Sequence, residues 1–291
     1  MQISHPKLSI VIVNYNGAKF IQRCLDSILN STQTPHEIIV IDNQSQDNSI
    51  AILKTYETRI TLILNPQNVG FAKANNQGFK VSKGDCILLL NNDTIVTSGA
   101  LDQMVSYLDN HPNVGGLGPR LLNPDGSVQS QGSILNQWIF KSKSPRSVSF
   151  LCFAAFLTRS KILQQMGGLD ENFFFYNEDI DLCKRFKKQG LDIIYFPESE
   201  IIHFGGLSTQ SLKPTAIIEG YRGGLYLCQK HYPGYVYHMY RILIVCVSFC
   251  LMAWHSTLSL AKKEHVQYKN AFGHILRLAL KNDIVPSISS L

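Results

Sequence analysis

The sequence has few charged residues and lacks the patterns that mark several classes of protein. Charged residues make up 16% of its 291 residues and hydrophobic ones 45%, which argues against general disorder and allows a sizeable core. Basic residues form no array interleaved with aromatic ones, so nucleic acid is not an expected partner. Internal repeats and low-complexity tracts are absent as well.

Paired cysteine motifs are also missing. The seven cysteines, an odd number, are scattered from Cys24 to Cys250 without any C-x-x-C pair. The one close pair, Cys246 and Cys250, lies inside an apolar run. We therefore expect reduced, buried thiols, and we expect neither a zinc site nor a disulfide framework.

The start of the sequence shows no signal peptide. Its first apolar run, residues 8–13, is six residues long and is followed at once by the polar residues Asn14 and Asn16. This pattern predicts that the globular part of the chain stays in the cytoplasm. The net charge of +6 favours anionic ligands or surfaces, such as nucleotide diphosphates and acidic lipids, without choosing between them.

Short apolar runs alternate with stretches of helical spacing in the first half of the chain. The runs suit strands buried on both faces of a sheet and cover residues 8–13, 38–41, 60–64 and 87–90, with helical stretches at 18–29, 48–56 and 71–81. This order predicts an α/β fold with a doubly wound, mostly parallel central sheet and flanking helices. Ligands of such sheets bind at the carboxyl ends of the strands, so the polar residues there are candidates for a site.

Helical patterns continue beyond a loop-rich middle. Residues 177–189 are predicted to form a helix, with Asn177 as its N-cap and Gly190 as its C-cap. Residues 242–254 are almost continuously apolar, but thirteen residues are fewer than the roughly twenty that a membrane-spanning helix needs. One interpretation is an interfacial or re-entrant helix on anionic lipid, held by flanking basic and aromatic residues, and the other is a buried core helix. We divide the chain into an α/β domain, residues 1–230, and a C-terminal helical segment, residues 231–291.

Four polar clusters follow predicted strands or open a predicted helix. They are Asn14-Tyr15-Asn16-Gly17, Asp42-Asn43, Asn91-Asn92-Asp93, and Glu178-Asp179 with Asp181. An Asp after the second strand can accept hydrogen bonds from a ribose or a base N–H, and a later one can hold a divalent ion that bridges phosphates. Either Asp could instead cap the turn that follows it. Their joint placement at strand ends favours a functional role for Asp42 and Asp93.

Three carboxylates, Glu178, Asp179 and Asp181, stand within four positions at the start of the helix predicted at 177–189. Acids at a helix N-terminus can simply offset the helix dipole. One of them could instead accept a proton from an attacking hydroxyl, and their closeness would shift their titration. The aromatic run 173–176 just before them could wall a sugar site or pack in the core. His203 precedes a glycine pair, where its imidazole could complete a metal shell or offset diphosphate charge.

Six strings together resemble the family 2 glycosyltransferases of the GT-A fold, especially the bacterial rhamnosyltransferase-like branch. They are LSIVIVNYNG, IVIDNQSQD, NVGFAKANNQG, LLLNNDT, GGLDENFFFYNEDIDLCKR and HFGG, which occur in the family's order over roughly residues 6–210. The resemblance implies an inverting transfer of a sugar, such as rhamnose, from a UDP- or dTDP-sugar. The implied acceptor is a hydroxyl of a glycan or of a lipid-linked glycan. The expected place of action is the inner face of the plasma membrane.

The resemblance also assigns roles to single residues. Asn14, Tyr15 and Asn16 would line the base pocket with Asp42, and the stretch 68–75 would bound the nucleotide. In that stretch Asn68 and Gly70 are candidates, with Lys73 near phosphate. Asn92 belongs to the strand-end motif, in which Asp93 would bind Mg²⁺ or Mn²⁺ together with His203. Asp179 would be the catalytic base, while spacing alone does not choose it over Glu178 and Asp181.

The strand-end motif departs from the family's DxD pattern. It reads Asn91-Asn92-Asp93, so the first Asp is missing, and metal binding through Asp93 and His203 would rely on diphosphate oxygens as further ligands. Two other functions compete with this one. A sugar nucleotidyltransferase would need a glycine-rich loop after the first strand, where only Gly17 stands. An inactive nucleotide-sugar-binding subunit would not need the three carboxylates that open the later helix.

Overall fold

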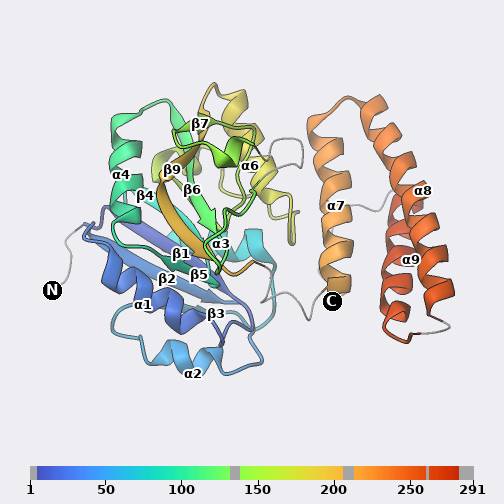
Figure 1. Cartoon of the computed structure of the whole chain (residues 1–291), viewed down its shortest axis with the longest axis horizontal. Helices are drawn as coiled ribbons and strands as arrows, with labels where there is room; N and C mark the ends of the chain where they lie inside the picture. The colour runs from blue at the N-terminus through green and yellow to red at the C-terminus, as the bar shows by residue number, and fades with distance from the viewer. Residues whose placement is uncertain (1–4, 132–137, 206–212, 260–261, 282–291) are drawn as a thin grey trace. The chain divides into compact units, whose positions relative to one another are not determined.

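The apolar runs of the first half form strands of one mixed sheet (Figure 1). The structure is a computed structural model that describes residues 5–131, 138–205, 213–259 and 262–281. Its strands are β1 Leu8–Asn14, β2 His36–Asp42, β3 Thr61–Leu64, β4 Cys86–Asn91, β5 Thr94–Val96, β6 Val114–Leu122, β7 Arg146–Ser147, β8 Ala155–Arg159 and β9 Asp192–His203. Its helices are α1 Ile21–Ser31, α2 Ser49–Lys54, α3 Phe71–Val81, α4 Ala100–Asn110, α5 Ser160–Gln165, α6 Glu178–Lys188, α7 Lys213–His231, α8 Gly234–Leu258 and α9 His265–Lys281, with a short 3₁₀ turn, η2, at Ile139–Lys141.

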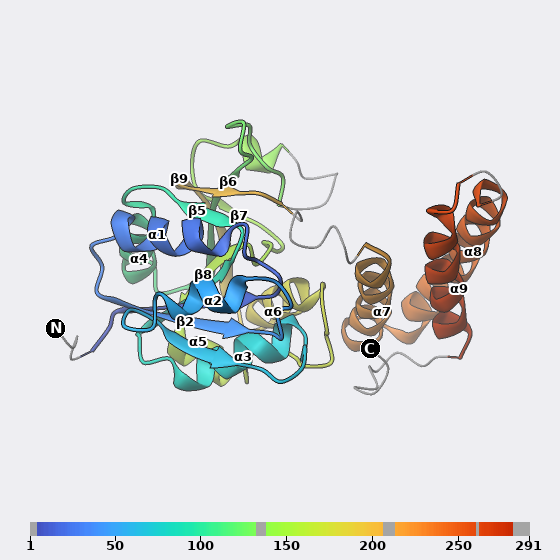
Figure 2. The ribbon, with the colours of Figure 1, turned by 90° about the horizontal axis from the view of Figure 1, so that it is seen from below.

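The sheet has the strand order β3-β2-β1-β4-β8-β6-β9-β5, with β7 paired to β9. Strands β3, β2, β1 and β4 run parallel, as predicted. Strand β8 is antiparallel to both β4 and β6, and β5 is antiparallel to β9. Side chains of β1 point alternately to the two faces of the sheet, and a layer of helices covers each face (Figure 2). Ile10 and Ile12 pack with α1, α2 and α4, while Val11 packs with α3, α5 and α6. The predicted fold class is confirmed.

The chain forms two compact units. The first consists of Met1–Asp170 and Asp179–Ser208, and the second of Glu171–Glu178 and Thr209–Leu291. In the second, which we call the helical unit, side chains of α7, α8 and α9 share a core that includes Leu225, Ile244 and Ile275. The boundary predicted at residue 230 falls at the end of α7, inside the helical unit, and a functional division there stays a prediction.

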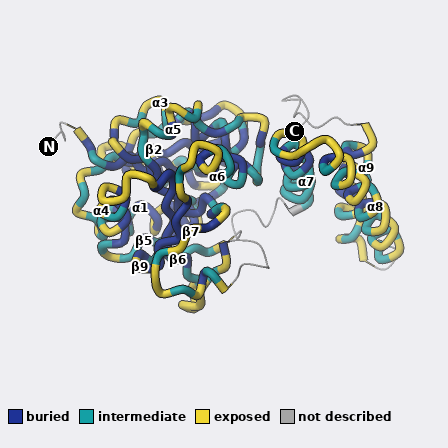
Figure 3. Tube along the Cα trace, turned by 90° about the horizontal axis from the view of Figure 1, so that it is seen from above, coloured by how far each residue is buried: buried dark blue, intermediate teal, exposed yellow. Residues whose placement is uncertain are grey.

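Helix α8 differs from the sequence-based expectation in length and burial. It has 25 residues, against the thirteen of the apolar run, so by length and composition it could cross a membrane. Most of this helix is intermediate or exposed (Figure 3). Only Tyr237, Ile244 and Ser248 are buried, whereas Leu243 is 56% and Phe249 59% exposed. All seven cysteines are free thiols, but Cys246 and Cys250 are exposed, so the prediction that they are buried is wrong. Both lie on α8, whose apolar composition does not translate into burial within the described chain.

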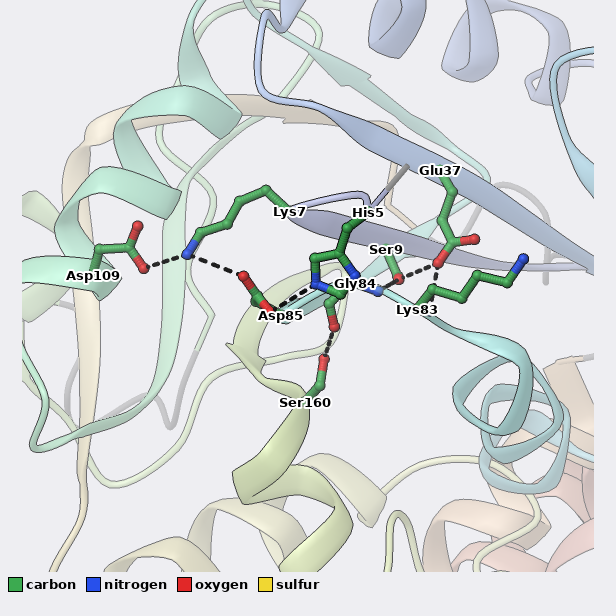
Figure 4. Close-up of polar contacts among 9 residues, drawn as sticks. All are labelled: His5, Lys7, Ser9, Glu37, Lys83, Gly84, Asp85, Asp109 and Ser160. Atoms are coloured by element: carbon green, nitrogen blue, oxygen red, sulfur yellow. Dashed lines mark hydrogen bonds and ion pairs between the residues drawn. The ribbon is translucent and has the colours of Figure 1, made fainter. Parts of the chain in front are cut away.

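The amino-terminal ends of the central strands carry a polar network on the rim opposite the predicted site (Figure 4). Lys7 forms ion pairs with Asp85 at 3.6 Å and Asp109 at 3.0 Å, and His5 Nε2 lies 3.1 Å from Asp85. Glu37 accepts hydrogen bonds from the Ser9 hydroxyl and from the backbone N–H of Lys83. This rim pairs its charges internally and ties the starts of β1, β2 and β4 together.

Candidate active site

Asn14 and Asp42 meet where the parallel strands end. They are opposite one another in the β1–β2 register, and both side chains are almost fully buried. Asn14 Nδ2 donates to Asp42 Oδ2 at 2.8 Å, and Asn92 Nδ2 donates to Asn14 Oδ1 at 2.8 Å. The three polar side chains that follow β1, β2 and β4 therefore form one connected network, as the strand-end argument predicts.

Gly17 makes this network sterically possible. A Cβ at this position would lie 2.2 Å from both Asn14 Oδ1 and Asn92 Nδ2, which are the two atoms of the hydrogen bond between them. Its backbone N–H also donates to Ser49 Oγ at 3.0 Å. The glycine in the predicted cluster is thus needed for close packing at the strand ends, besides any role beside a ligand.

Asp42 uses most of its acceptor capacity within the protein. Its Oδ1 accepts the backbone N–H of Ser45 at 2.9 Å, and its Oδ2 accepts the Ser45 hydroxyl at 2.7 Å as well as Asn14. A carboxylate has about four lone-pair positions, so roughly one remains for a ligand. The contact of Asp42 with a base or ribose stays a prediction. In the structure its carboxylate connects the end of β1 with the loop that follows β2.

The loop after β1 is fixed from both sides. Asn16 adopts φ 51°, its backbone N–H donates to Ser45 Oγ at 2.9 Å, and its side-chain oxygen accepts the backbone N–H of Gln46 at 2.7 Å. Tyr15 lies between Asn14 and Asn16 and is half-buried. The predicted base-pocket residues therefore stand on a rigid loop rather than on a mobile one.

The start of α3 carries Asn68, Gly70 and Lys73, which the resemblance places near the nucleotide. Gly70 precedes the helix with φ 86°, and its backbone N–H donates to Asn68 Oδ1 at 3.0 Å, which also accepts from Asn43 Nδ2 at 2.7 Å. Lys73 stands in the first turn and has no ion pair within the described part of the chain. A helix N-terminus with an adjacent lysine is a favourable environment for a diphosphate.

Asp93 and His203 are brought together by an antiparallel strand pair that the sequence did not reveal. In the pairing of β5 with β9, Thr94 lies opposite His203, and Asp93 Oδ1 lies 3.3 Å from His203 Nε2. His203 Nδ1 is 2.7 Å from Gln129 Oε1, an acceptor, so this nitrogen carries the proton. The other ring nitrogen, Nε2, faces Asp93 and Asn91, whose Nδ2 is 3.4 Å away.

A carboxylate oxygen of Asp93 and an imidazole nitrogen of His203 thus face each other. Two such groups suit a shared cation, and the donor set of one oxygen and one imidazole nitrogen is compatible with Mg²⁺ or Mn²⁺. Among the residues that the structure describes, no group of three or more His, Cys, Asp or Glu side chains gathers as a metal cage. An ion held here would therefore need further oxygen ligands from a bound substrate.

The three carboxylates of α6 have different environments. Asp181 is fully buried and pairs with Arg185 at 2.8 Å, and Arg185 in turn donates to the carbonyls of Met166 and Gly168. Glu178 is also buried. Burial raises the pKa of Asp179 to about 6, and its Oδ1 accepts the backbone N–H of Ile180 at 2.8 Å.

The helix that carries Asp179 packs against the segment that precedes β8. Leu182 and Cys183 of α6 share a buried cluster with Leu151 and Phe153. The carbonyl of the next residue, Ala154, accepts the backbone N–H of Asn91 at 2.9 Å. The segment 151–154 thus connects α6 with the strand end that precedes Asp93.

Two supporting residues had no clear signal in the sequence. Gln129 lies 74 positions before His203 and reaches it through the bend that follows β6, where its backbone N–H donates to Leu121. The side chain of Asn43 forms hydrogen bonds with Asn65, Asn68 and the backbone N–H of Val69, whereas the sequence indicates only that it follows Asp42. Contacts of this kind depend on strand order, which spacing in the sequence does not give.

The fold and the strand-end site define a class of protein through solved structures. The mannosyltransferase PcManGT from Pyrobaculum calidifontis, in complex with GDP-Man and Mn²⁺, has a TM-score of 0.62 at 15% identity, over 96% of this chain and 88% of that one. GalNAc-T7 with UDP, GalNAc and Mn²⁺ has a TM-score of 0.57 at 16% identity, over 68% of this chain and 43% of that one. These likenesses show a glycosyltransferase fold of the GT-A type.

The sequence profile of glycosyl transferase family 2 matches residues 9–167, which is more than half of the chain, and the chain belongs to this family. The O-antigen biosynthesis protein RfbC of Myxococcus xanthus is 27% identical over 71% of this chain, which spans 18% of that protein's length. The N-acetylglucosaminyl-diphospho-decaprenol L-rhamnosyltransferase of Mycobacterium tuberculosis is 26% identical over 69% of this chain and 77% of its own length. The predicted family and its rhamnosyltransferase-like branch are confirmed.

Proposed function

We propose that this chain is an inverting glycosyltransferase that moves a sugar from a UDP- or dTDP-sugar to a hydroxyl of a glycan or lipid-linked glycan. The observation that supports this most is the pair of Asp93 and His203 on the same rim as the Asn14–Asp42 network, with α6, which carries Asp179, packed against the segment that precedes β8. Nucleotide, diphosphate and acceptor would each then have candidate residues within reach of one edge of the sheet.

Asp93 and His203 would hold Mg²⁺ or Mn²⁺, with oxygens of the donor diphosphate as the remaining ligands. A divalent cation bound there supplies charge neutralisation for the departing diphosphate. Gln129 would fix the imidazole so that Nε2 keeps its lone pair, which is the usual role of a partner behind a histidine ligand. Lys73 and the N-terminus of α3 would add positive charge at the phosphates.

Asp179 would act as the base. Its carboxylate takes the proton of the acceptor hydroxyl while that oxygen attacks the anomeric carbon, and the bond from this carbon to the diphosphate oxygen breaks on the opposite face. A pKa of about 6 leaves the carboxylate ionised at neutral pH and keeps it basic enough to accept a proton. Asp181 does not suit this role because Arg185 already holds it within α6.

The identity of the sugar and of the acceptor is inferred from relatives. One relative is named a rhamnosyltransferase that acts on an N-acetylglucosaminyl-diphospho lipid, and another is named for O-antigen biosynthesis. We infer that the donor is dTDP-rhamnose or a related UDP- or dTDP-sugar, and that the acceptor is a sugar linked to a lipid by a diphosphate.

A donor screen tests the proposal. Thermal unfolding is measured with a panel of UDP-, dTDP- and GDP-sugars, each with Mn²⁺, Mg²⁺ or a chelator. We expect a rise in melting temperature with a UDP- or dTDP-sugar that depends on the cation. Slow release of nucleoside diphosphate from the stabilising donor would separate a transferase from an inactive binding subunit, and stabilisation by GDP-sugars alone would contradict the donor assignment.

We also propose that the chain acts at the cytoplasmic face of a membrane, with the exposed face of α8 on anionic lipid. Residues 209–291 contain nine Lys or Arg and three Asp or Glu, so the whole net charge of +6 falls in this part of the chain. Exposed apolar side chains on α8 include Met239, Ile242, Leu243, Phe249 and Trp254. An apolar helix face with a surplus of basic residues favours an anionic membrane surface.

Vesicle sedimentation tests this location. We expect binding to vesicles that contain phosphatidylglycerol, and weaker binding to phosphatidylcholine alone. The double substitution Leu243→Glu and Phe249→Glu should abolish binding, whereas Val81→Glu, at an exposed apolar residue of α3, should leave it unchanged. Concentration-dependent dimerisation that the double substitution removes, without any vesicle binding, would show that α8 meets a second copy instead.

A further inference from the structure

Residues 138–147, which include η2 and β7, expose one aromatic and several basic side chains. Trp138 is 70% exposed, and Lys141, Lys143 and Arg146 are exposed as well. None of these three cations forms an ion pair within the described ranges of the chain. One short stretch of the first unit therefore presents an indole ring and three positive charges to solvent.

The sequence around this segment supplies no compensating charge. Residues 126–169 contain five Lys or Arg and no Asp or Glu. Asp192 contacts the end of the segment, where its Oδ1 accepts the Ser147 hydroxyl at 3.3 Å. A second acid, Glu200, is already paired with Arg120 at 3.0 Å. A local surplus of positive charge of this kind attracts an anionic partner.

The backbone of the segment is held firmly although its side chains are exposed. Phe140 is buried and packs edge-on against Tyr195, with ring centroids 5.1 Å apart, and its carbonyl accepts the Tyr195 hydroxyl at 2.8 Å. Arg120 Nη2 donates to the carbonyl of Ser142 at 3.0 Å, and β7 pairs with β9 (Figure 1). A fixed backbone loses little conformational freedom on binding, so this surface is preorganised.

The indole ring distinguishes between anionic partners. Tryptophan is favoured at the boundary between lipid headgroups and acyl chains, where its ring meets apolar groups and its N–H meets polar ones. Each Lys or Arg near an anionic lipid surface adds about fivefold to the affinity. A free phosphate or diphosphate would use the cations and leave the ring in water. The combination therefore fits an anionic membrane better than a small soluble anion.

We propose that residues 138–147 are a docking surface of the first unit for an anionic membrane. Trp138 enters the headgroup region, while Lys141, Lys143 and Arg146 face the lipid phosphates. The inference deepens the proposed function and rests on it, because it takes a membrane as the place of action. A ring and three charges are too weak to hold the protein alone, so this contact adds to that of α8 and does not replace it. It gives the unit with the candidate active site its own contact with the surface that carries a lipid-linked acceptor.

The chain contains two tryptophans, so each proposed membrane contact has its own fluorescent reporter. Trp254→Phe leaves Trp138 as the reporter of the first unit, and Trp138→Phe leaves Trp254 as the reporter of α8. Each full-length variant is mixed with vesicles of phosphatidylcholine, of phosphatidylglycerol or of brominated phosphatidylglycerol. We expect Trp138 emission to shift to shorter wavelength with phosphatidylglycerol, to be quenched by the brominated lipid, and to stay unchanged with phosphatidylcholine alone.

Charge reversal tests the basic side chains. Lys141→Glu combined with Lys143→Glu should weaken partition to phosphatidylglycerol vesicles by at least about 25-fold, because two contributions of about fivefold are lost. Lys54→Glu combined with Arg59→Glu is the matched control, since it changes the net charge equally at exposed residues in α2 and the turn after it. This control should weaken partition by less than about threefold, because charges away from the docking surface are screened by salt.

Two measurements separate lost docking from a damaged fold or active site. The melting temperature of the Lys141 and Lys143 variant should match that of the control, since both side chains are exposed. Slow release of dTDP from dTDP-rhamnose with Mn²⁺, in the absence of vesicles, should also match. Transfer to a lipid-linked acceptor in phosphatidylglycerol vesicles should fall in step with partition, and equal transfer by both variants would contradict docking.

The pattern of quenching separates the failures. If brominated lipid quenches Trp254 and not Trp138, this inference alone is refuted. If it quenches neither, the proposed location at a membrane fails as well. A Trp138 signal that responds to inorganic diphosphate but not to brominated lipid would assign the segment to a soluble anion instead. Quenching of Trp138 in a protein that releases no nucleoside diphosphate from any donor would support docking while the transferase proposal fails.

Discussion

Both rims of the central sheet carry acidic residues and a histidine, but the acidic residues differ in exposure and in their ion-pair partners. On the amino-terminal rim, Asp85 is half exposed and pairs with His5 and Lys7 (Figure 4). The hydrogen bond from His5, more than the charge of Lys7, holds the pKa of Asp85 below its usual value. On the carboxyl-terminal rim, Asp93 is 2% exposed, and its ion-pair partner in the described chain is His203 alone.

This difference shows how to separate structural from functional charges. Exposed ion pairs such as Lys7–Asp85 satisfy each other and contribute little, about 0–1 kcal/mol. A buried carboxylate whose partner in the described chain is one imidazole, with no Lys or Arg beside it, is costly unless a ligand brings a cation.

The largest effect is expected at Asp179. Asp179→Asn keeps the shape of the side chain but cannot accept the proton, so kcat should fall by about a thousandfold, within the usual range for a general base. Donor affinity by calorimetry should remain within a factor of two. Near-native turnover would remove Asp179 from this role and direct attention to Glu178.

The next effect is expected at Asp93. Asp93→Ala would remove one of the two proposed protein ligands of the cation, so nucleotide affinity in the presence of Mn²⁺ should weaken by about ten- to a hundredfold. Affinity measured with a chelator should change little in the same variant. An unchanged calorimetric constant with Mn²⁺ present would contradict the metal site.

A pH dependence should follow from the raised pKa of Asp179. Because burial brings this pKa to about 6, kcat should fall about tenfold per pH unit below pH 6 and level off above pH 7. The folded-state pKa lies above the unfolded value of about 4, so stability from this carboxyl is present at low pH and is lost as pH rises from about 4 to 6. Asp179→Asn should therefore raise the melting temperature at pH 7.5 and change it little at pH 4, as thermal unfolding would show.

The smallest effect is expected on the opposite rim. Asp85→Asn weakens exposed ion pairs with Lys7 and His5, so the free energy of unfolding should fall by less than about 1 kcal/mol. Turnover and Mn²⁺-dependent donor binding should match the unsubstituted protein. Urea unfolding and a kinetic assay check both points, and a large loss of activity would show that the two rims are not independent.

The sequence predicted the parallel half of the fold well because local rules determine it. Apolar runs identified β1, β2, β3 and β4, although β3 is an edge strand with Leu64 exposed, so the prediction that its run is buried on both faces is wrong. Helix α3 has the predicted bounds, where Gly70 and Ser82 flank it. The same rule placed Asn14, Asp42 and Asn92 on one rim. These inferences need only strand direction and the alternation of side chains.

The antiparallel half was not predictable in the same way. Nothing in the local pattern indicates that β5 pairs with β9, and therefore that Asp93 meets His203 and Gln129. Likewise, spacing could not distinguish Asp181 from Asp179, whereas the ion pair with Arg185 does. Such assignments depend on contacts between residues far apart in the chain, which composition and periodicity do not encode.

The path of the chain between its two units affects how this protein can be divided. The polypeptide passes from the first unit to the helical unit after Asp170, returns at Asp179, and leaves again after Ser208. A chimera that exchanges only the residues after 208 would therefore pair the loop 171–178 with a foreign α7 in place of the helix that it contacts in this protein. Exchanging helical units between relatives should succeed only when the loop and α7 are transferred together. The residues after 208 are therefore not a separable module on their own.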